Sequence, residues 1–236
     1  MIHSIRKLFL GKTYSETKPL ESAIGKRIKN IVAIWNNELH EDIGIEKILR
    51  LFLALSQFLF PGIYIKQVFC KKGAAYQDLS MDFFILFKVG FPVFILKNNL
   101  QDNHFIFWIV VWLASETILY IPTLIFASDN FSRPRSYRRS MLLLFFNYLE
   151  IVFAFGVIYA QGDYLNKPLV HWFDSIYFSF MTSSTIGFGD MYPITPFGKF
   201  LVSCQSMFFL IFVVLFLNFF TKKIDHKGYF DHNNKL

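Results

Sequence analysis

The sequence has few cysteines and few charged residues for its length. Two of its 236 residues are cysteine, and Asp, Glu, Lys and Arg together make up 17%. Cys204 falls in an apolar run and Cys70 stands beside two lysines, so neither predicts a disulfide framework or a metal site. Leu8–Leu10 is too short to be the apolar region of a cleavable signal peptide.

A catalytic constellation is also missing, because the Ser, His and acidic residues are scattered among apolar segments. We therefore expect no enzyme, no cofactor and no small-molecule substrate. What is present is apolar: 54% of the residues are hydrophobic, 19% are aromatic and 31 are Phe. This exceeds the apolar share of ordinary soluble domains. In such a chain the net charge of +7 indicates basic loops beside membrane lipids rather than nucleic-acid binding.

Long apolar runs predict an all-α membrane protein, since ~20 apolar residues cross the ~30 Å hydrocarbon core of a bilayer. Four runs of this kind are 81–96, 105–127, 141–160 and 197–220. A fifth stretch, 48–65, is interrupted by Arg50, Gln57 and Pro61-Gly62. We interpret it as a re-entrant or surface-lying segment bent at Pro61-Gly62, which leaves four spans. The alternative is a fifth span.

The most informative motif lies between the last two runs. Residues 185–190 read Thr-Ile-Gly-Phe-Gly-Asp and follow a hydroxyl-rich stretch that ends at Ser184. The combination resembles the pore loop of potassium channels, whose filters have the related form Thr-Val-Gly-Tyr-Gly. The resemblance is strong over about 170–200 and looser over the flanking helices. It implies a pore domain of helix, pore helix, filter and helix, here preceded by a peripheral transmembrane helical hairpin.

The filter chemistry explains the two glycines. A potassium ion must exchange its water shell for oxygens, and a line of carbonyls supplies them only if alternate residues are left-handed. That conformation is nearly free for glycine, and Gly187 and Gly189 stand at alternate positions. By resemblance, the ion-binding filter comprises Thr185, Ile186, Gly187, Phe188 and Gly189, with K+ as the permeant ion. Ile186 and Phe188 are expected to wedge against the pore helix.

Three residues are expected to support the filter, namely Asp190, Ser184 and Thr182. Met181 lies where some family members carry a glutamate that pairs with the filter aspartate, so Asp190 needs another partner. Because one chain has one pore loop, the resemblance implies a homotetramer with cyclic symmetry. The expected function is passive, potassium-selective conduction. The alternatives are a weakly selective cation channel and a non-conducting membrane signalling or scaffold subunit.

The chain divides into an N-terminal segment, peripheral membrane helices, a basic linker, the pore domain and a short tail. Their bounds are 1–47 with an amphipathic helix near 19–37, then 48–127, 128–140, 141–222 and 223–236. Basic loops of membrane proteins face the cytoplasm. We therefore expect a multi-pass protein of the cell membrane with both termini cytoplasmic and the filter mouth outside.

Two further sets of residues are candidates for functional roles. One face of 197–220 carries four apolar residues that are candidates for lining a cavity or gate, or else face lipid: Leu210, Val213, Val214 and Leu217. Lys88 and Glu116 lie within apolar runs, where ionisable groups are costly and usually paired. An antiparallel hairpin about residue 100 brings them within about one helical turn, so we hypothesise an ion pair. The alternative is that Lys88 snorkels to an interface and Glu116 is protonated or hydrogen-bonded.

Overall fold

The computed structural model describes residues 22–38, 41, 43–126 and 137–224. Their regular structure is α-helix, apart from short 3₁₀ turns and an isolated β-bridge between Leu165 and Pro193. The all-α membrane fold expected from the sequence is confirmed. The chain forms two compact units, Met1–Lys88 with Ser115–Phe131 and Val89–Ala114 with Ser132–Leu236. Helices α5 (Ala74–Lys97) and α6 (His104–Phe126) contribute to both.

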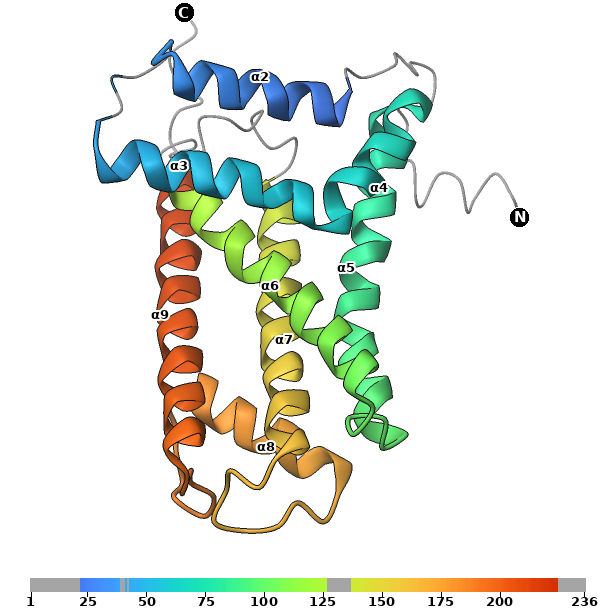
Figure 1. The fold of residues 1–236 in the computed structure, drawn as a ribbon, viewed down its shortest axis with the longest axis vertical. Helices are drawn as coiled ribbons and strands as arrows, with labels where there is room; N and C mark the ends of the chain where they lie inside the picture. Colours follow the sequence, from blue (N-terminus) through green and yellow to red (C-terminus); the bar gives the residue numbers. More distant parts are fainter. Residues whose placement is uncertain (1–21, 39–40, 42, 127–136, 225–236) are drawn as a thin grey trace, which may run out of the picture. The chain divides into compact units, whose positions relative to one another are not determined.

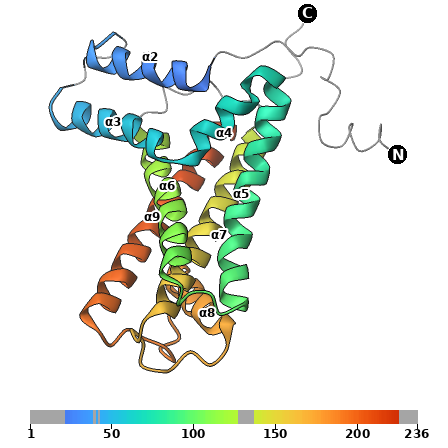
Figure 2. The ribbon, with the colours of Figure 1, turned by 45° about the vertical axis from the view of Figure 1, so that its right-hand side comes forward.

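The first unit begins, within the described residues, with helix α2 (Ala23–Trp35). It is shorter than the predicted 19–37 because Ser22 caps it, the Ser22 hydroxyl accepting the Gly25 N–H at 3.1 Å. Residues 1–21 lie outside the described ranges. Helix α3 (Ile45–Ser56) lies beside α2 in both Figure 1 and Figure 2. Lys47 Nζ donates to the carbonyl of Trp35 at 2.8 Å and fixes one end of this pair.

A sharp bend separates α3 from α4 (Pro61–Phe69). The chain passes through a 3₁₀ turn, Gln57–Leu59, and an extended Phe60, and Pro61 then starts the new helix. The two halves, Ile45–Leu59 and Pro61–Lys72, meet at 69°. The bend therefore falls where the sequence predicts it. By length and composition the described residues contain four helices that can cross a membrane, or five if the bent pair counts as one span.

The second unit contains the pore-domain helices α7 (Tyr137–Gln161), α8 (Trp172–Ser183) and α9 (Pro196–Ile224). The predicted segments 141–160 and 197–220 thus extend further at their ends. Residues 137–140 of the predicted basic linker already belong to α7, whereas 127–136 and 225–236 lie outside the described ranges. Figures 1 and 2 show the short α8 beside the Gln161 end of α7 and the Pro196 end of α9.

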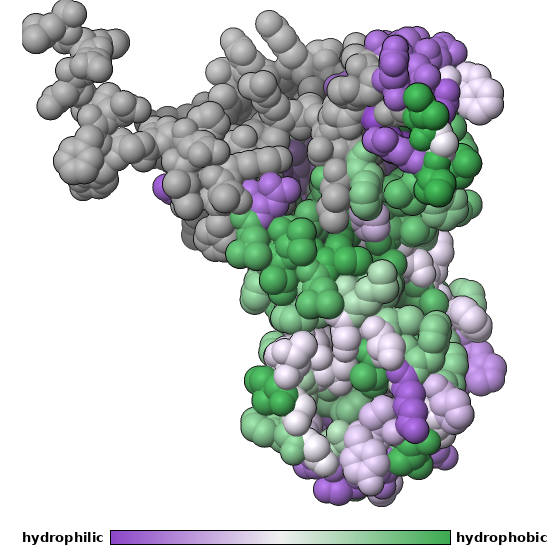
Figure 3. Space-filling model, turned by 90° about the vertical axis from the view of Figure 1, so that its left-hand side faces the viewer, coloured by the Kyte–Doolittle hydropathy of each residue, from purple (hydrophilic) through white to green (hydrophobic). Residues whose placement is uncertain are grey.

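Burial differs strongly between the two long helices of this unit. Half of the apolar window of α7 is buried, because α8 and α9 both pack against this helix, whereas only 22% of the α9 window is buried. The face drawn in Figure 3 exposes many apolar side chains. Such surfaces are typical of helices that contact lipid or another protein chain. Helix α9 therefore presents apolar surface that a single chain leaves uncovered.

Candidate functional site

Helix α8 is fixed at both ends by local hydrogen bonds. At its start, Asp174 Oδ2 accepts the N–H groups of Val170 and His171 at 2.9 and 2.8 Å, which satisfies donors that a helix leaves open. At its end, the Ser184 hydroxyl donates to the Phe180 carbonyl at 2.8 Å, and the Thr185 N–H donates to the Thr182 carbonyl at 3.2 Å. The helix therefore stops directly before the Thr-Ile-Gly-Phe-Gly-Asp segment, which follows its partially negative carboxyl end.

The backbone of this segment alternates in handedness. Thr185, Gly187 and Gly189 have φ angles of 56°, 53° and 80°, whereas no positive φ occurs at Ile186 or Phe188. The left-handed geometry at the two glycines is the one that the sequence requires of them. Positive φ at Thr185 was not predicted, and it carries a steric cost for a β-branched residue. The segment is exposed throughout 185–190 in the single chain.

One expectation about this segment is wrong for the single chain. Ile186 and Phe188 were predicted to wedge against the pore helix, but their side chains are 54% and 69% exposed. The helices of one chain therefore leave about half or more of each residue uncovered. Exposed apolar groups of this kind are typical of surfaces that contact another chain or lipid.

Position 181 holds no glutamate, and Asp190 has a different partner. The Tyr177 hydroxyl on α8 donates to Asp190 Oδ2 at 3.1 Å. Desolvation raises the pKa of the Tyr177 phenol, and the hydrogen bond to Asp190 and the charge of that carboxylate raise it further. Asn166 holds the other side, since its Nδ2 donates to the Asp190 carbonyl at 3.4 Å and its Oδ1 accepts the Tyr192 N–H at 2.8 Å.

Behind the segment lies a buried polar network centred on Gln205 of α9. Its Nε2 approaches Ser179 Oγ at 2.7 Å, the Ser179 carbonyl at 2.9 Å and Ser183 Oγ at 2.6 Å, all on α8. Its Oε1 accepts the Tyr159 hydroxyl of α7 at 2.8 Å. The Ser179 hydroxyl in turn donates to the Val152 carbonyl at 2.6 Å. The amide therefore joins all three helices of the pore domain.

The predicted cavity residues lie on the apolar surface of α9. Leu210, Val214 and Leu217 are exposed in the single chain, and Val213 is half-buried. Intervening Phe212 and Leu215 are buried, so the exposed positions form one face of the helix.

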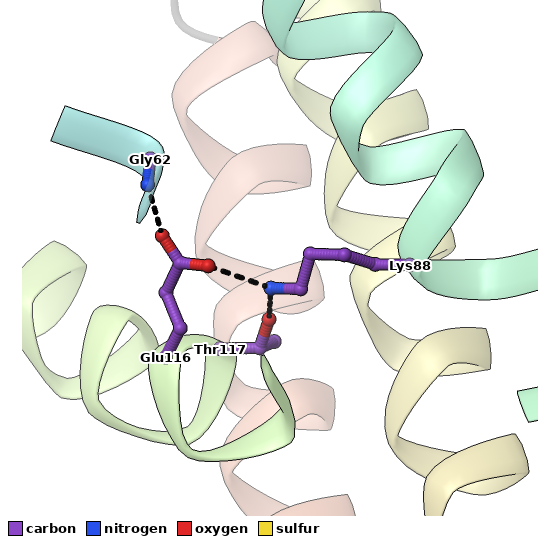
Figure 4. Close-up of polar contacts among 4 residues, drawn as sticks. All are labelled: Gly62, Lys88, Glu116 and Thr117. Carbon is purple, nitrogen blue, oxygen red and sulfur yellow. Dashed lines mark hydrogen bonds and ion pairs between the residues drawn. The ribbon is translucent and has the colours of Figure 1, made fainter. Parts of the chain in front are cut away.

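In the other unit, the structure brings Lys88 and Glu116 together. Lys88 Nζ lies 3.3 Å from Glu116 Oε2, and their side chains are 3% and 16% exposed. Figure 4 shows the lysine reaching from α5 to the carboxylate on α6. Lys88 Nζ also donates to Thr117 Oγ1 at 2.6 Å, and Glu116 Oε1 accepts the Gly62 N–H at 3.0 Å.

Sequence reasoning missed Tyr177, Asn166, Tyr159 and Gln205. A signal existed for Gln205, because an amide within an apolar helix of membrane length needs a buried partner. No such signal marks Tyr177 or Asn166, which are ordinary residues of a helix and a loop.

Comparison with known proteins addresses the same region. Residues 141–226 match the family model described as "Ion channel". Potassium channel K1 of Plasmodium berghei (strain Anka) is 32% identical over 78 residues, which cover 32% of this chain and 4% of that protein. The chain thus corresponds to a small part of that relative's length. No solved structure matches.

The matched segment holds α7 almost entirely, α8, the Thr185–Asp190 segment and α9. This match indicates a channel rather than an enzyme. The described residues contain four helices of membrane length, so the chain is a multi-pass membrane protein. Residues 141–226 thus match an ion-channel family, and both comparisons support the potassium channel pore-loop family that the sequence resembles.

Proposed function

We propose that the protein is a potassium-selective channel whose filter is the backbone of Thr185–Gly189. The observation that carries this proposal is the alternation of handedness over 185–189, directly after a capped helix of 12 residues, which is too short to cross a bilayer. Such alternation turns successive carbonyls toward one side, where they replace water around a cation. The partially negative carboxyl end of α8 adds favourable electrostatics for K+ at the inner end of the filter.

Four copies complete the pore in this proposal. One chain supplies one line of carbonyls, and a cation needs oxygens on all sides, so a cyclic homotetramer is the simplest assembly. Exposed Ile186 and Phe188 and the uncovered apolar face of α9 support it, because neighbouring subunits would bury both. Leu210, Val213, Val214 and Leu217 then line an apolar cavity below the filter.

Asp190, Ser184 and Thr182 support the filter in this proposal. Tyr177 and Asn166 hold Asp190 from two sides, and the Ser184 and Thr182 contacts fix the turn from α8 into Thr185. The filter mouth faces outside and both termini lie in the cytoplasm, as the basic loops predict.

Potassium flux into liposomes tests the proposal. Purified protein reconstituted in liposomes is expected to carry K+ flux that external barium blocks. Gly187→Ala is expected to abolish the flux, because φ is +53° at Gly187 and a Cβ is strained there. Gly90→Ala is the matched control, since Gly90 is helical and a Cβ there meets no atom within 4 Å. Flux that survives Gly187→Ala contradicts the proposal, and absence of flux from the wild type favours a non-conducting subunit.

A further inference from the structure

A single buried carboxylate ties three segments of the first unit together. Glu116 on α6 accepts the Gly62 N–H with one oxygen and pairs with Lys88 of α5 through the other (Figure 4). Lys88 is held on its other side by Thr117 and lies 5.4 Å from the centre of the Phe84 ring. Since an ion pair at this depth is costly unless it is fully bonded, the arrangement fixes the amino end of α4.

A side chain at position 62 would meet this carboxylate. Gly62 is the second residue of α4, whose first N–H groups have no partner within the helix. The carboxylate accepts one of them and is favoured by the positive end of the helix dipole. A Cβ at position 62 would overlap Glu116 Oε1, so any other residue displaces the carboxylate.

This contact places the bend between α3 and α4 deep in the membrane. Glu116 is twelve residues after the start of α6 at His104 and ten before its end at Phe126. At ~1.5 Å per residue it is ~18 Å and ~15 Å from the two ends, near the middle of a helix of membrane length. Gly62 is hydrogen-bonded to that position, so the chain reaches the same depth there.

The opposite end of α4 returns to the membrane surface. The helix ends at Phe69, a 3₁₀ turn over Cys70–Lys72 follows, and α5 then starts back in the other direction. Gln77 on α5 donates from Nε2 to the Lys66 carbonyl at 3.0 Å, so the end of α4 lies beside the start of α5. Lys71 and Lys72 are exposed at this turn, as basic residues at a headgroup layer are.

Helix α2 connects this surface to the start of α3. Gln67 Oε1 of α4 accepts the Ser22 hydroxyl at 2.9 Å and the Ile24 N–H at 3.2 Å, which places the start of α2 near the surface end of α4. The other end of α2 is bonded to Lys47 of α3. Helix α2 has 13 residues, or ~20 Å, which is shorter than the ~30 Å hydrocarbon core. It also carries Lys26, Arg27 and Lys29 and cannot lie across that core.

We propose that 45–72 is a re-entrant segment that enters and leaves one leaflet on the same side, with the Glu116–Gly62 contact at its deepest point. The start of α3 and the turn at 70–72 are joined by the basic helix α2, so they lie on one face of the membrane. In this topology the segment is not a fifth span. The inference does not depend on conduction by the pore domain.

The exposed face of α3 identifies its surroundings as lipid. Five large apolar side chains recur at spacings of three and four residues, and each is more than half exposed: Ile45, Ile48, Phe52, Leu55 and Leu59. The opposite face buries Leu53 and Ala54 against the protein. An apolar stripe beside basic residues of α2 matches the acyl region and the anionic headgroups of one phospholipid leaflet.

Sidedness of single cysteines tests the topology. In a chain with Cys70 and Cys204 replaced by serine, Ile43→Cys and Lys71→Cys are expected to react with a membrane-impermeant thiol reagent from the same side. Asp102→Cys, between α5 and α6, is the control and is expected to react from the other side. Reaction of positions 43 and 71 from opposite sides overturns the proposal.

Spin labels test the lipid contact in vesicles of phosphatidylcholine and phosphatidylglycerol. A label at Phe52→Cys is expected to collide with oxygen and not with a water-soluble nickel chelate, whereas Glu46→Cys is expected to show the reverse. Shielding of position 52 from both reagents indicates a protein partner or a second copy on this face and contradicts the proposal.

A third variant pair tests the carboxylate contact itself. Gly62→Ala is expected to raise the thiol-labelling rate of buried Ile63→Cys at least tenfold, because the carboxylate is displaced. Glu116→Asp in the same chain shortens the acid and is expected to restore slow labelling. Equal labelling rates with and without Gly62→Ala overturn the role of the contact.

Discussion

Replacing Gln205 by Leu tests whether the polar network behind the filter holds the pore helix in place. The substitution places an apolar residue of similar size in α9 and removes the amide that bonds Tyr159, Ser179 and Ser183. All four residues are buried, so water does not replace the lost bonds. The expected result is a looser attachment of α8 to α9 and α7.

The magnitude follows from the number of bonds. Hydrogen bonds between helices in a membrane contribute about 0.6 kcal/mol on average and about 1.7 kcal/mol at most. Three side-chain bonds of average strength amount to about 2 kcal/mol, or about a 30-fold change in the folding equilibrium. We expect Gln205→Leu to lower the free energy of unfolding in mixed detergent micelles by this amount and to shorten channel openings.

Two further variants make the measurement specific. Ser203→Ala removes a hydroxyl of the same helix that bonds only to the Lys199 carbonyl one turn away, and is expected to change stability by less than about 0.5 kcal/mol. Tyr159→Phe combined with Gln205→Leu is expected to cost less than the two changes separately, because both act on one bond. The reasoning is refuted if Gln205→Leu leaves the free energy of unfolding unchanged. It is also refuted if the effects of Tyr159→Phe and Gln205→Leu on that free energy are fully additive.

Three other outcomes are expected at the pore. Tyr177→Phe removes the bond to Asp190 and is expected to shorten the time that the filter conducts, measured as mean open time; unchanged open times contradict this role. Because the pKa of Tyr177 is raised, the wild type keeps the protonated phenol and its bond at neutral pH and loses them only as external pH rises through that pKa. Tyr177→Phe is expected to lack this fall in mean open time at alkaline pH. Identical pH profiles of the variant and the wild type contradict a role for the Tyr177–Asp190 bond. Leu217→Cys is expected to be blocked by a cytosolic thiol reagent, whereas Leu142→Cys on the exposed side of α7 is not; equal sensitivity removes Leu217 from the conduction path.

Four of the eight α-helices in the described residues follow from apolar runs of membrane length, which is why 141–160 and 197–220 predict α7 and α9 closely. The ends are less predictable, because helices continue into polar residues such as Tyr137–Ser140 once their backbone bonds are made. The bend at Pro61 was predictable from a local rule about proline. Its attachment to Glu116 was not, since it joins positions 54 residues apart.

Within the candidate site, the glycines were predictable because backbone handedness restricts residue type strongly. The partner of Asp190 was not, because a tyrosine thirteen positions earlier carries no distinguishing pattern. The surroundings of Ile186 and Phe188 were not predictable for the same kind of reason. In the proposed tetramer their packing depends on a neighbouring chain, and one sequence does not show where that neighbour lies.

The reversal potential of single channels in a planar bilayer tests the central claim most directly. With K+ on one side and Na+ on the other, and then with a tenfold K+ gradient, the account predicts a reversal potential that follows K+ at about 59 mV per tenfold ratio. A reversal potential near zero with K+ facing an equal concentration of Na+ indicates a weakly selective pore. That result contradicts a filter built from the carbonyls of Thr185–Gly189.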